Sequence, residues 1–568
     1  MKLRFLAVAG PARCREQLSA RLTAQHGDEL VEATAPQPFS LWIEPGTPVL
    51  RNEGGTAAAI GMMFDRSSAR RLTELPDWPG LERIVTRDFW GPYALLNAEG
   101  TMHSVMRDPS GSVPVYYGKA GVLQVYASDA GMLRLACSNG FRPNLDTVRH
   151  WLRYPGLRIA RTGAEGISEL LPGMMLAVSG SEQSVRQAWY PQSFVAPDTT
   201  LISFEEAAVQ LREELLGRLP LLAAGEPNVV VHLSGGLDSS IVAAAFAHGS
   251  VPFRALTFAT ASPEGDERRY ARAVASHLGI ELLEVTEQEL DSPQTEATDP
   301  FHPPVDPVRR SIQRSLVRAA GTDGLLFDGA GGDNVFASIN TAAPAIDAFR
   351  RHGAGHAVKA LRDIAARHDC TFWSAARSAF RRARRPNMIS WPSSELFLHP
   401  SFVAESLFLA EHPWLSSSDG LLPGRADHLR MIVGVQDFLS DPAPGLPCNL
   451  HPLLCQPILE TCLRIPSWMW VEGGRDRAVA RSAFRSLLPD QILDRRAKGS
   501  LTSMFVRHFA ARRSELKNCL LSGRLAAERL IDVRSIAAYL DRKEEPRDAS
   551  YTRILGFVSI EHWLQSFG

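Results

Sequence analysis

The chain has 568 residues, of which 45% are hydrophobic and 22% charged, and its formal net charge is −1 at pH 7. Its length exceeds one ordinary hydrophobic core, so we expect two or three domains. The balanced charge gives no global field for nucleic acid or an anionic membrane, and no apolar run approaches the roughly 20 residues that span a bilayer. We therefore expect a cytoplasmic protein with no nucleic-acid or membrane partner.

The first 195 residues are predicted to be rich in β-strands. Lys2 and Arg4 precede an apolar run at 5–10 that loosely imitates a signal peptide, but a buried first strand explains the run better. Short apolar stretches at 104–108 and 113–117 flank a turn sequence. A polar, proline-containing stretch near 190–200 is predicted to be a linker. The seven cysteines form no CxxC pair, which argues against a disulfide framework or a cysteine-based zinc site.

From residue 203 the pattern changes to alternating helices and strands. Such alternation indicates a parallel sheet with helices on both faces. Beyond residue 335 the sequence is mostly helical. The predicted helices cover 204–219, 238–248, 265–278 and 308–320, and the predicted strands cover 228–233, 254–260, 280–285 and 324–327.

One motif carries the strongest chemical signal, and it lies between a hydrophobic strand and a helix. It reads Ser234-Gly235-Gly236-Leu237-Asp238-Ser239-Ser240. Paired glycines let the backbone approach an anion, and the N–H groups that follow lie at a helix N-terminus, so the motif can hold phosphate or pyrophosphate. The serine hydroxyls add donors, and Asp238 can hold the magnesium that accompanies phosphates. The lysine of a Walker A loop is absent.

This motif resembles the pyrophosphate loop of the N-type ATP pyrophosphatases, and the chain is similar to the asparagine synthetase B superfamily. A second glycine-rich loop, Asp328-Gly329-Ala330-Gly331-Gly332-Asp333, follows in the expected order. The resemblance implies ATP and Mg²⁺ as cofactors, with Asp238 and Asp333 as the metal pair. A helix N-cap is the structural alternative for Asp333, and the two roles are compatible.

The same resemblance implies further residues around the nucleotide. The backbone near His232 and Thr260, and that of Asp328 and Gly329, should line it. Lys498 lies where relatives carry a lysine that contacts phosphate, and a cation there would stabilise the transition state of carboxylate adenylation. A solvated basic turn is the alternative for Lys498.

The N-terminal part resembles an Ntn-type glutaminase domain in several stretches. They are 89–94, 107–111, 114–117, 127–129 and 171–173. A working glutaminase needs cysteine as its first mature residue, whereas this sequence begins with Met1. We therefore expect a degenerate Ntn-type glutaminase-like αββα sandwich over 1–195. An α/β ATP-pyrophosphatase synthetase domain with a helical C-terminal part should follow over 203–568, with an amine other than ammonia from glutamine as acceptor.

Several positions depart from asparagine synthetases. Ala330 replaces a glutamate, and residues 451–456 replace an Arg-x-Pro-Phe-Leu-Asp segment. Residues 452–470 and 473–481 instead resemble the lasso-peptide cyclases, or macrolactam synthetases. That resemblance implies that an Asp or Glu side chain of a ribosomal peptide is adenylated and then attacked by the peptide's own N-terminal amine. It also implies a precursor peptide, a leader peptidase and a leader-recognition protein as partners.

Three other functions stay open on the sequence. One is a small-molecule amide ligase of the asparagine synthetase or β-lactam synthetase kind, although β-lactam synthetases carry a tyrosine at the position of Ala330. Another is a catalytically silent binding scaffold, against which intact Asp238, Asp333 and Lys498 count. A tRNA-modifying pyrophosphatase is disfavoured, because neither a thiol pair nor a basic surface accompanies the loop.

Overall fold

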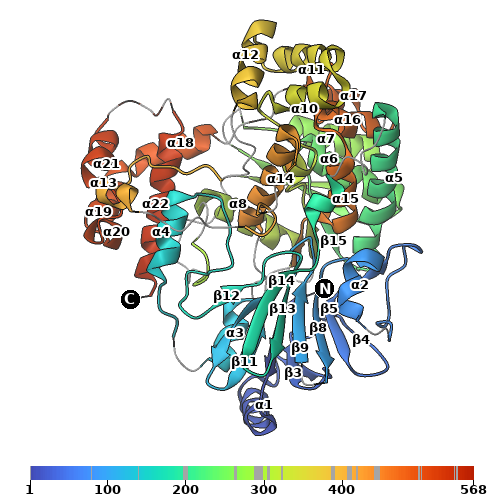
Figure 1. Ribbon diagram of the computed structural model, residues 1–568, viewed down its shortest axis with the longest axis vertical. Helices are drawn as coiled ribbons and strands as arrows, with labels where there is room; N and C mark the ends of the chain where they lie inside the picture. The colour runs from blue at the N-terminus through green and yellow to red at the C-terminus, as the bar shows by residue number, and fades with distance from the viewer. Residues whose placement is uncertain are drawn as a thin grey trace.

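Two antiparallel sheets and one parallel sheet organise the protein, and Figure 1 shows the antiparallel strands at the bottom with the helices of the C-terminal part above them and to the left. A computed structural model describes residues 2–77, 80–100, 102–137, 140–195, 203–260, 265–286, 299–303, 307–321, 324–384, 391–405, 412–416, 420–439, 448–496, 499, 502–542, 544, 546 and 548–567.

The first antiparallel sheet has the strand order β12-β10-β11-β1-β3-β2. Its strands are β1 (Phe5–Ala9), β2 (Val31–Ala33), β3 (Phe39–Ile43), β10 (Tyr116–Ala120), β11 (Leu123–Ala127) and β12 (Ser168–Glu169). The second sheet has the order β14-β13-β9-β8-β5-β4. Its strands are β4 (Val49–Arg51), β5 (Ala57–Gly61), β8 (Tyr93–Glu99), β9 (Met102–Arg107), β13 (Met174–Ser179) and β14 (Glu182–Gln187). Two short strands, β6 (Phe64–Asp65) and β7 (Phe89–Trp90), pair with each other.

These two sheets form the centre of a four-layer sandwich. Side chains alternate between the two faces of a strand, so Phe5 and Ala7 of β1 join a core with residues of the second sheet, such as Leu96. Leu6 and Val8 face the other way, toward α1 (Ala12–His26) and α3 (Ala130–Ala136). Helix α2 (Leu81–Asp88) covers the outer face of the second sheet. This αββα arrangement confirms the expected N-terminal fold class.

The third sheet is parallel and has the order β17-β16-β15-β18-β19. Its strands are β15 (Val229–His232), β16 (Arg254–Ala259), β17 (Leu282–Thr286), β18 (Leu325–Phe327) and β19 (Cys448–Leu450). Val229 and Val231 of the central strand pack with α5 (Phe204–Ala223) and α6 (Leu237–His248), whereas Val230 packs on the opposite face with α8 (Pro307–Ala320). Helix α7 (Arg268–Leu278) lies against β16. Helices on both faces confirm the expected α/β architecture.

Helices dominate the rest of the chain. They are α9 (Gly332–Val335), α10 (Ala343–His352), α11 (Ala354–Arg367), α12 (Phe372–Ala383), α13 (Pro400–Ala404), α14 (Pro423–Val435), α15 (Gln456–Arg464), α16 (Ala478–Ala483), α17 (Asp490–Leu493), α18 (Thr502–Ala511), α19 (Arg513–Leu521), α20 (Arg524–Ala527), α21 (Val533–Leu540) and α22 (Ser550–Gln565). Short 3-10 turns are η1 (Pro191–Phe194), η4 (Gln436–Phe438), η5 (Pro452–Leu454) and η6 (Ser467–Trp470), and a hairpin joins β20 (Val471–Glu472) to β21 (Arg475–Asp476). None of the described helices combines the length and apolar character that a bilayer crossing requires.

The C-terminal helices share a core with a helix from the N-terminal part. Val148 and Leu152 of α4 (Leu145–Arg153) belong to the same hydrophobic cluster as Phe557 and Trp563 of α22. In Figure 1, α4 lies beside this bundle, away from the antiparallel sheets. Apolar packing therefore joins the C-terminal helices to α4 of the N-terminal part.

A buried carboxylate joins the sandwich to the helical region a second time. Glu460 of α15 accepts hydrogen bonds from Arg66 Nη1 at 2.5 Å, Trp189 Nε1 at 3.0 Å and Gln456 Nε2 at 2.7 Å. Its side chain is almost fully buried, so the charge depends on these donors. The two halves of the chain are thus held by both polar and apolar contacts.

Candidate active site

The candidate site lies at the carboxyl ends of three neighbouring parallel strands. His232 ends β15, Thr260 follows β16, and Asp328 with Gly329 follows β18. In open α/β sheets this edge is where ligands bind, especially where the strand order reverses. Here the order reverses around β15, whose neighbours are β16 and β18. The residues that sequence reasoning placed near the nucleotide therefore meet at one edge of the sheet.

The pyrophosphate-type loop is folded onto itself by its own hydroxyls. Ser239 Oγ accepts a hydrogen bond from Ser234 N at 3.2 Å and lies 3.1 Å from Ser234 Oγ. Ser240 Oγ donates to Gly236 O at 2.7 Å. Gly235 has a φ of +71°, in the left-handed region that glycine adopts without strain. Leu237 begins α6 and is buried, so its side chain anchors the turn.

The second glycine-rich loop comes into direct contact with the first. A Cβ added at Gly329 would lie 2.5 Å from the backbone nitrogen of Ser239. A Cβ added at Gly332 would lie 2.4 Å from Cγ of Asp238. Both distances are far below van der Waals contact, so glycine at these positions permits the approach. The motif glycines are required by packing as well as by backbone conformation.

The two predicted metal ligands converge on one guanidinium nitrogen. Arg477 Nη1 donates to Asp238 Oδ1 at 3.1 Å and Oδ2 at 3.0 Å, and to Asp333 Oδ1 at 2.5 Å. Asp238 is buried and Asp333 is half-exposed. Asp333 does not cap its helix, because Gly331 is the N-cap of α9 and no side-chain cap bond forms. The N-cap alternative for Asp333 is therefore wrong.

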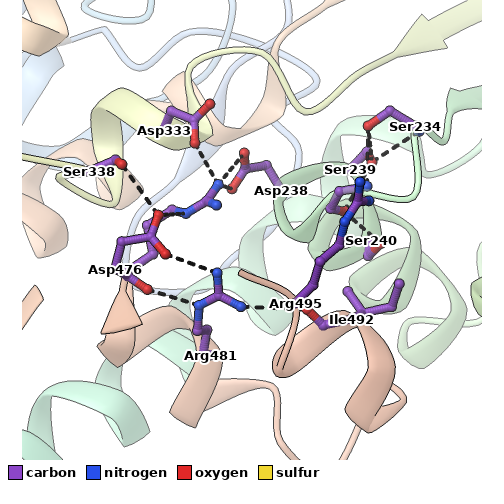
Figure 2. Close-up of polar contacts among 12 residues, drawn as sticks. Ser234, Asp238, Ser239, Ser240, Asp333, Ser338, Asp476, Arg481, Ile492 and Arg495 are labelled. Carbon is purple, nitrogen blue, oxygen red and sulfur yellow. Dashed lines mark hydrogen bonds and ion pairs between the residues drawn. The ribbon is translucent and has the colours of Figure 1, made fainter. Parts of the chain in front are cut away.

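Arg477 is itself held by a second group of charges, which Figure 2 shows around Asp476, Ser338 and Arg481. Arg477 Nε donates to Asp476 Oδ2 at 3.0 Å, and Arg481 Nη2 donates to Asp476 Oδ1 at 3.0 Å. Ser338 Oγ adds a bond of 3.3 Å to Asp476 Oδ2. Burial opposes the charge of Arg477, but Asp238, Asp333 and Asp476 together raise its pKa above the ordinary value. The guanidinium therefore stays charged at the centre of three carboxylates.

A buried ion pair fixes the start of the second loop. Asp328 Oδ1 accepts from His451 Nδ1 at 2.8 Å and from the backbone nitrogen of Ala330 at 3.0 Å. Burial disfavours both charges, yet the pair lowers the pKa of Asp328 and raises the pKa of His451. Asn449 of β19 also reaches Asp328 Oδ2 at 3.3 Å. The loop is thus tied to β19, the neighbouring strand.

Arg495 contacts the pyrophosphate-type loop through a backbone carbonyl. Its Nη1 donates to Gly235 O at 3.1 Å, its guanidinium lies 3.8 Å from the centre of the Tyr270 ring, and its Nη2 pairs with Glu267. Gly499 N also donates to Glu267 Oε1. Lys498, one residue earlier in the chain, lies outside the described residues, and its predicted role stays a prediction.

The donor set fits a magnesium ion that is held together with phosphate. Mg²⁺ prefers hard oxygen ligands and is commonly bound by one or two carboxylates plus substrate phosphates. Asp238 and Asp333 supply two carboxylates from facing loops, beside the Ser234 and Ser239 hydroxyls. Across the part of the chain that the structure describes, no group of three or more His, Cys, Asp or Glu residues could hold a metal alone. ATP would bring the remaining ligands.

Sequence reasoning missed three polar residues of this site. They are Arg477 and Arg495, which follow the two glycine-rich loops in the sequence, and Glu267, which lies between those loops. Arg477 has a φ of +51°, unusual for a residue with a long side chain, and this conformation has no sequence signature. The density of arginines between 475 and 481 was the available signal.

An α/β domain whose two glycine-rich loops meet at a strand-order reversal has the arrangement of a nucleotide-binding site. The sequence profile described as asparagine synthase matches residues 221–436 and 449–565. Because these segments make up more than half of the chain, the chain belongs to the asparagine synthase family.

More specific similarities are distant. Amidase chyE of Penicillium rubens is 26% identical over 279 residues, which cover 45% of this chain and 40% of that protein. The match thus spans less than half the length of this curated relative. Two solved structures align over 56% of this chain at 12% identity with a TM-score of 0.21. One is described as the allosteric regulatory enzyme of purine biosynthesis, with 92% of that chain covered. The other is the glutamine phosphoribosylpyrophosphate amidotransferase from B. subtilis, complexed with ADP and GMP, with 93% covered.

Proposed function

We propose that this chain is an ATP-dependent carbon–nitrogen ligase that activates a carboxylate by adenylation and releases AMP and pyrophosphate. The observation that carries the proposal is the convergence of Asp238 and Asp333 from two facing glycine-rich loops. Family membership supports the same reaction class. A purely structural role would not need charged groups of this kind at the carboxyl edge of a parallel sheet.

Each part of the site has a task in this reaction. The N–H groups at the start of α6 and the Ser234 and Ser239 hydroxyls bind phosphate oxygens. Asp238 and Asp333 would hold Mg²⁺, which neutralises phosphate charge and makes pyrophosphate a better leaving group. Arg495 keeps the loop at its position through Gly235 O. Lys498 would stabilise negative charge that develops at the carboxylate as it is activated.

The proposed substrate is a ribosomal peptide, in which an activated Asp or Glu side chain is attacked by the N-terminal amine to form a macrolactam. The partners would be the precursor peptide, the leader peptidase and the leader-recognition protein. Resemblance of residues 452–470 and 473–481 to the lasso-peptide cyclases supports this assignment. Intramolecular attack within a held peptide also removes about 7–11 kcal/mol of barrier that two separate reactants would face.

The contacts of two substituted residues support a substrate other than a small amino acid. Where asparagine synthetases carry an Arg-to-Asp segment, this chain has His451 and Gln456 at the two ends. His451 is paired with Asp328, and Gln456 donates to Thr86 O and to Glu460. Both side chains are buried and engaged within the protein, so these contacts do not present a polar pocket for a free amino acid.

The test incubates the protein with ATP, Mg²⁺, leader peptidase, recognition protein and a candidate precursor peptide. We expect AMP and pyrophosphate as products and a core peptide lighter by one water. Asp238→Asn should abolish both. Asp494→Asn, which changes a half-exposed carboxylate outside the two loops, is the matched control and should leave both intact.

Different outcomes of this experiment would overturn the macrolactam assignment and the ligase assignment. Formation of AMP with free amino acids, but an unchanged mass of the cleaved core peptide, would replace the macrolactam assignment with a small-molecule ligase. Absence of ATP binding and turnover with peptides and amino acids alike would favour a binding scaffold and overturn the ligase assignment itself.

A further inference from the structure

Arg477 occupies an unusual place for a residue outside both glycine-rich loops. A single nitrogen of its guanidinium contacts both carboxylates that would hold magnesium, at 2.5–3.1 Å. Mg²⁺ binds oxygen ligands at roughly 2.0–2.1 Å in an octahedral arrangement. Because Nη1 of Arg477 lies between the two carboxylates, the guanidinium and a metal that bridges them would compete for the same position.

We propose that Arg477 is an internal counter-ion of the Asp238–Asp333 pair and that the carboxylates exchange it for Mg²⁺ when the nucleotide binds. This inference rests on the proposed function, because it takes the two aspartates as the metal ligands. In the nucleotide-free protein the Arg477 guanidinium occupies the metal site. Divalent ions without nucleotide therefore bind weakly, and the metal binds together with the nucleotide.

The electrostatic reason lies in the burial of Asp238 and Arg477, whereas Asp333 is half-exposed. Two carboxylates brought close together repel each other unless a positive charge lies between them. Asp238 and Arg477 are both nearly excluded from solvent, so water screens their interaction poorly. Without a bound metal, the guanidinium keeps the two facing loops together. Exchange with Mg²⁺ preserves that bridging role while adding the phosphate oxygens as ligands.

The surroundings of Arg477 allow the exchange without loss of the guanidinium from the site. Its Nε is bonded to Asp476, which Arg481 and Ser338 hold in place. Arg481 in turn donates to Leu493 O at 2.7 Å, so Asp476 is supported by a helix end rather than by solvent. Rotation of the guanidinium can therefore move Nη1 away from the two carboxylates, while the bond from Nε to Asp476 keeps the Arg477 side chain beside them. The charge stays beside the phosphate-binding loop.

The backbone of Arg477 suggests an informative substitution. Its φ of +51° and ψ of +34° are left-handed, a conformation that asparagine tolerates better than arginine. Arg477→Asn removes the charge and the reach of the side chain without adding backbone strain. Arg475→Asn is the matched control, because Arg475 lies two residues away and pairs with Asp494 rather than with either metal ligand.

The experiment measures Mn²⁺ binding to the nucleotide-free protein by the loss of the free-ion electron paramagnetic resonance signal. We expect Arg477→Asn to bind Mn²⁺ at least tenfold more tightly than wild type and Arg475→Asn to bind as wild type does. We also expect the melting temperature of Arg477→Asn to rise with added Mn²⁺ far more than that of wild type, because the metal replaces the lost cation.

Equal or weaker Mn²⁺ binding by Arg477→Asn would overturn the exchange and leave Arg477 as a structural ion pair. If that variant does not fold, Arg477→Met, which keeps an apolar stem without charge, is measured in the same way. The proposed function is tested apart from this comparison by the affinity of Asp238→Asn for Mg·ATP. Unchanged affinity there would overturn the metal assignment, whereas lost affinity with no effect at Arg477 would overturn only the exchange.

Discussion

Replacement of Gly332 by alanine is a steric test of the site that removes no charged group. Gly332 is the first residue of α9, and its φ is outside the left-handed region, so alanine suits the backbone. The added Cβ would lie 2.4 Å from Asp238 Cγ and 2.5 Å from Asp238 Cβ. Carbon atoms rest at roughly 3.5–4.0 Å, so the aspartate or the loop must retreat by about 1 Å.

The magnitude of the effect follows from this displacement. A catalytic group misplaced by about 1 Å can cost about 10²-fold in rate, so we expect a loss of that order in ATP-dependent ligation. Mg·ATP affinity should also fall, because Asp238 would no longer face Asp333 from its present position. Overpacking of this kind costs about 1–3 kcal/mol of stability, which leaves a protein of this size folded.

The assay combines isothermal titration with Mg·ATP, single-turnover release of AMP and thermal unfolding. Gly217→Ala is the matched control, because nothing lies within 4 Å of its added Cβ in α5. That change should leave activity unaltered and stabilise the helix by about 0.5–1 kcal/mol. A folded Gly332→Ala protein with wild-type Mg·ATP affinity and wild-type turnover would refute the view that close approach of the two loops positions Asp238.

Three further predictions concern other parts of the chain. Lys498→Met should lower the rate of carboxylate activation by about 10²–10³-fold, as loss of one transition-state donor does. Titrations should show a nearly unchanged affinity for Mg·ATP, and equal losses of rate and affinity would contradict this role of Lys498. Arg495→Ala removes the bond to Gly235 O and the contact with Tyr270. It should weaken Mg·ATP binding by about tenfold, the equivalent of a cation–π contact of roughly 1–2 kcal/mol. Fluorescence titration would measure the affinity, and an unchanged affinity would refute this role of Arg495. Burial lowers the pKa of His412 from 6.5 to about 4. As the pH falls from 6.5 to about 4, the unfolded chain therefore takes up a proton on this histidine before the folded protein does. Stability that is present above pH 6.5 is lost toward pH 4. His412→Gln should flatten that loss by up to about 1.4 kcal/mol per pH unit in denaturant melts, and an unchanged slope would show that other groups cause it.

The alternating region of the fold was predictable because its signals are local. β15 and α6 begin and end within two residues of the predicted bounds, since a run of β-branched residues favours a strand and an alanine-rich run favours a helix. Helix α7 begins at Arg268 rather than residue 265, and β10 begins at Tyr116 rather than residue 113. Strand β19 was missed because a polar residue, Asn449, stands at its centre and because it pairs with β18 across more than a hundred positions. Strand β18 is equally short but wholly apolar, and it was predicted.

The charged centre of the site shows a different limit. Asp238 and Asp333 could be singled out because glycines, a strand and a helix surround them in fixed order. Arg477 could not, because its contacts join it to residues far away in the sequence and its left-handed backbone has no side-chain signature. The N-cap alternative for Asp333 was wrong, because Gly331 is the N-cap of α9, and the metal role of Asp333 stays a prediction.

The same reasoning explains why the nucleotide is easier to predict than the acyl substrate. A phosphate site is built from short loops that follow strands, so one stretch of sequence contains most of it. The surroundings of such a loop are assembled from separate segments, as the pairing of Asp328 with His451 and Asn449 shows. A change at His451 would therefore alter the surroundings of Asp328, although the sequence of the loop that begins at Asp328 stays the same. Local motifs contain only part of such an arrangement, so they predict the substrate of this chain less well than its nucleotide.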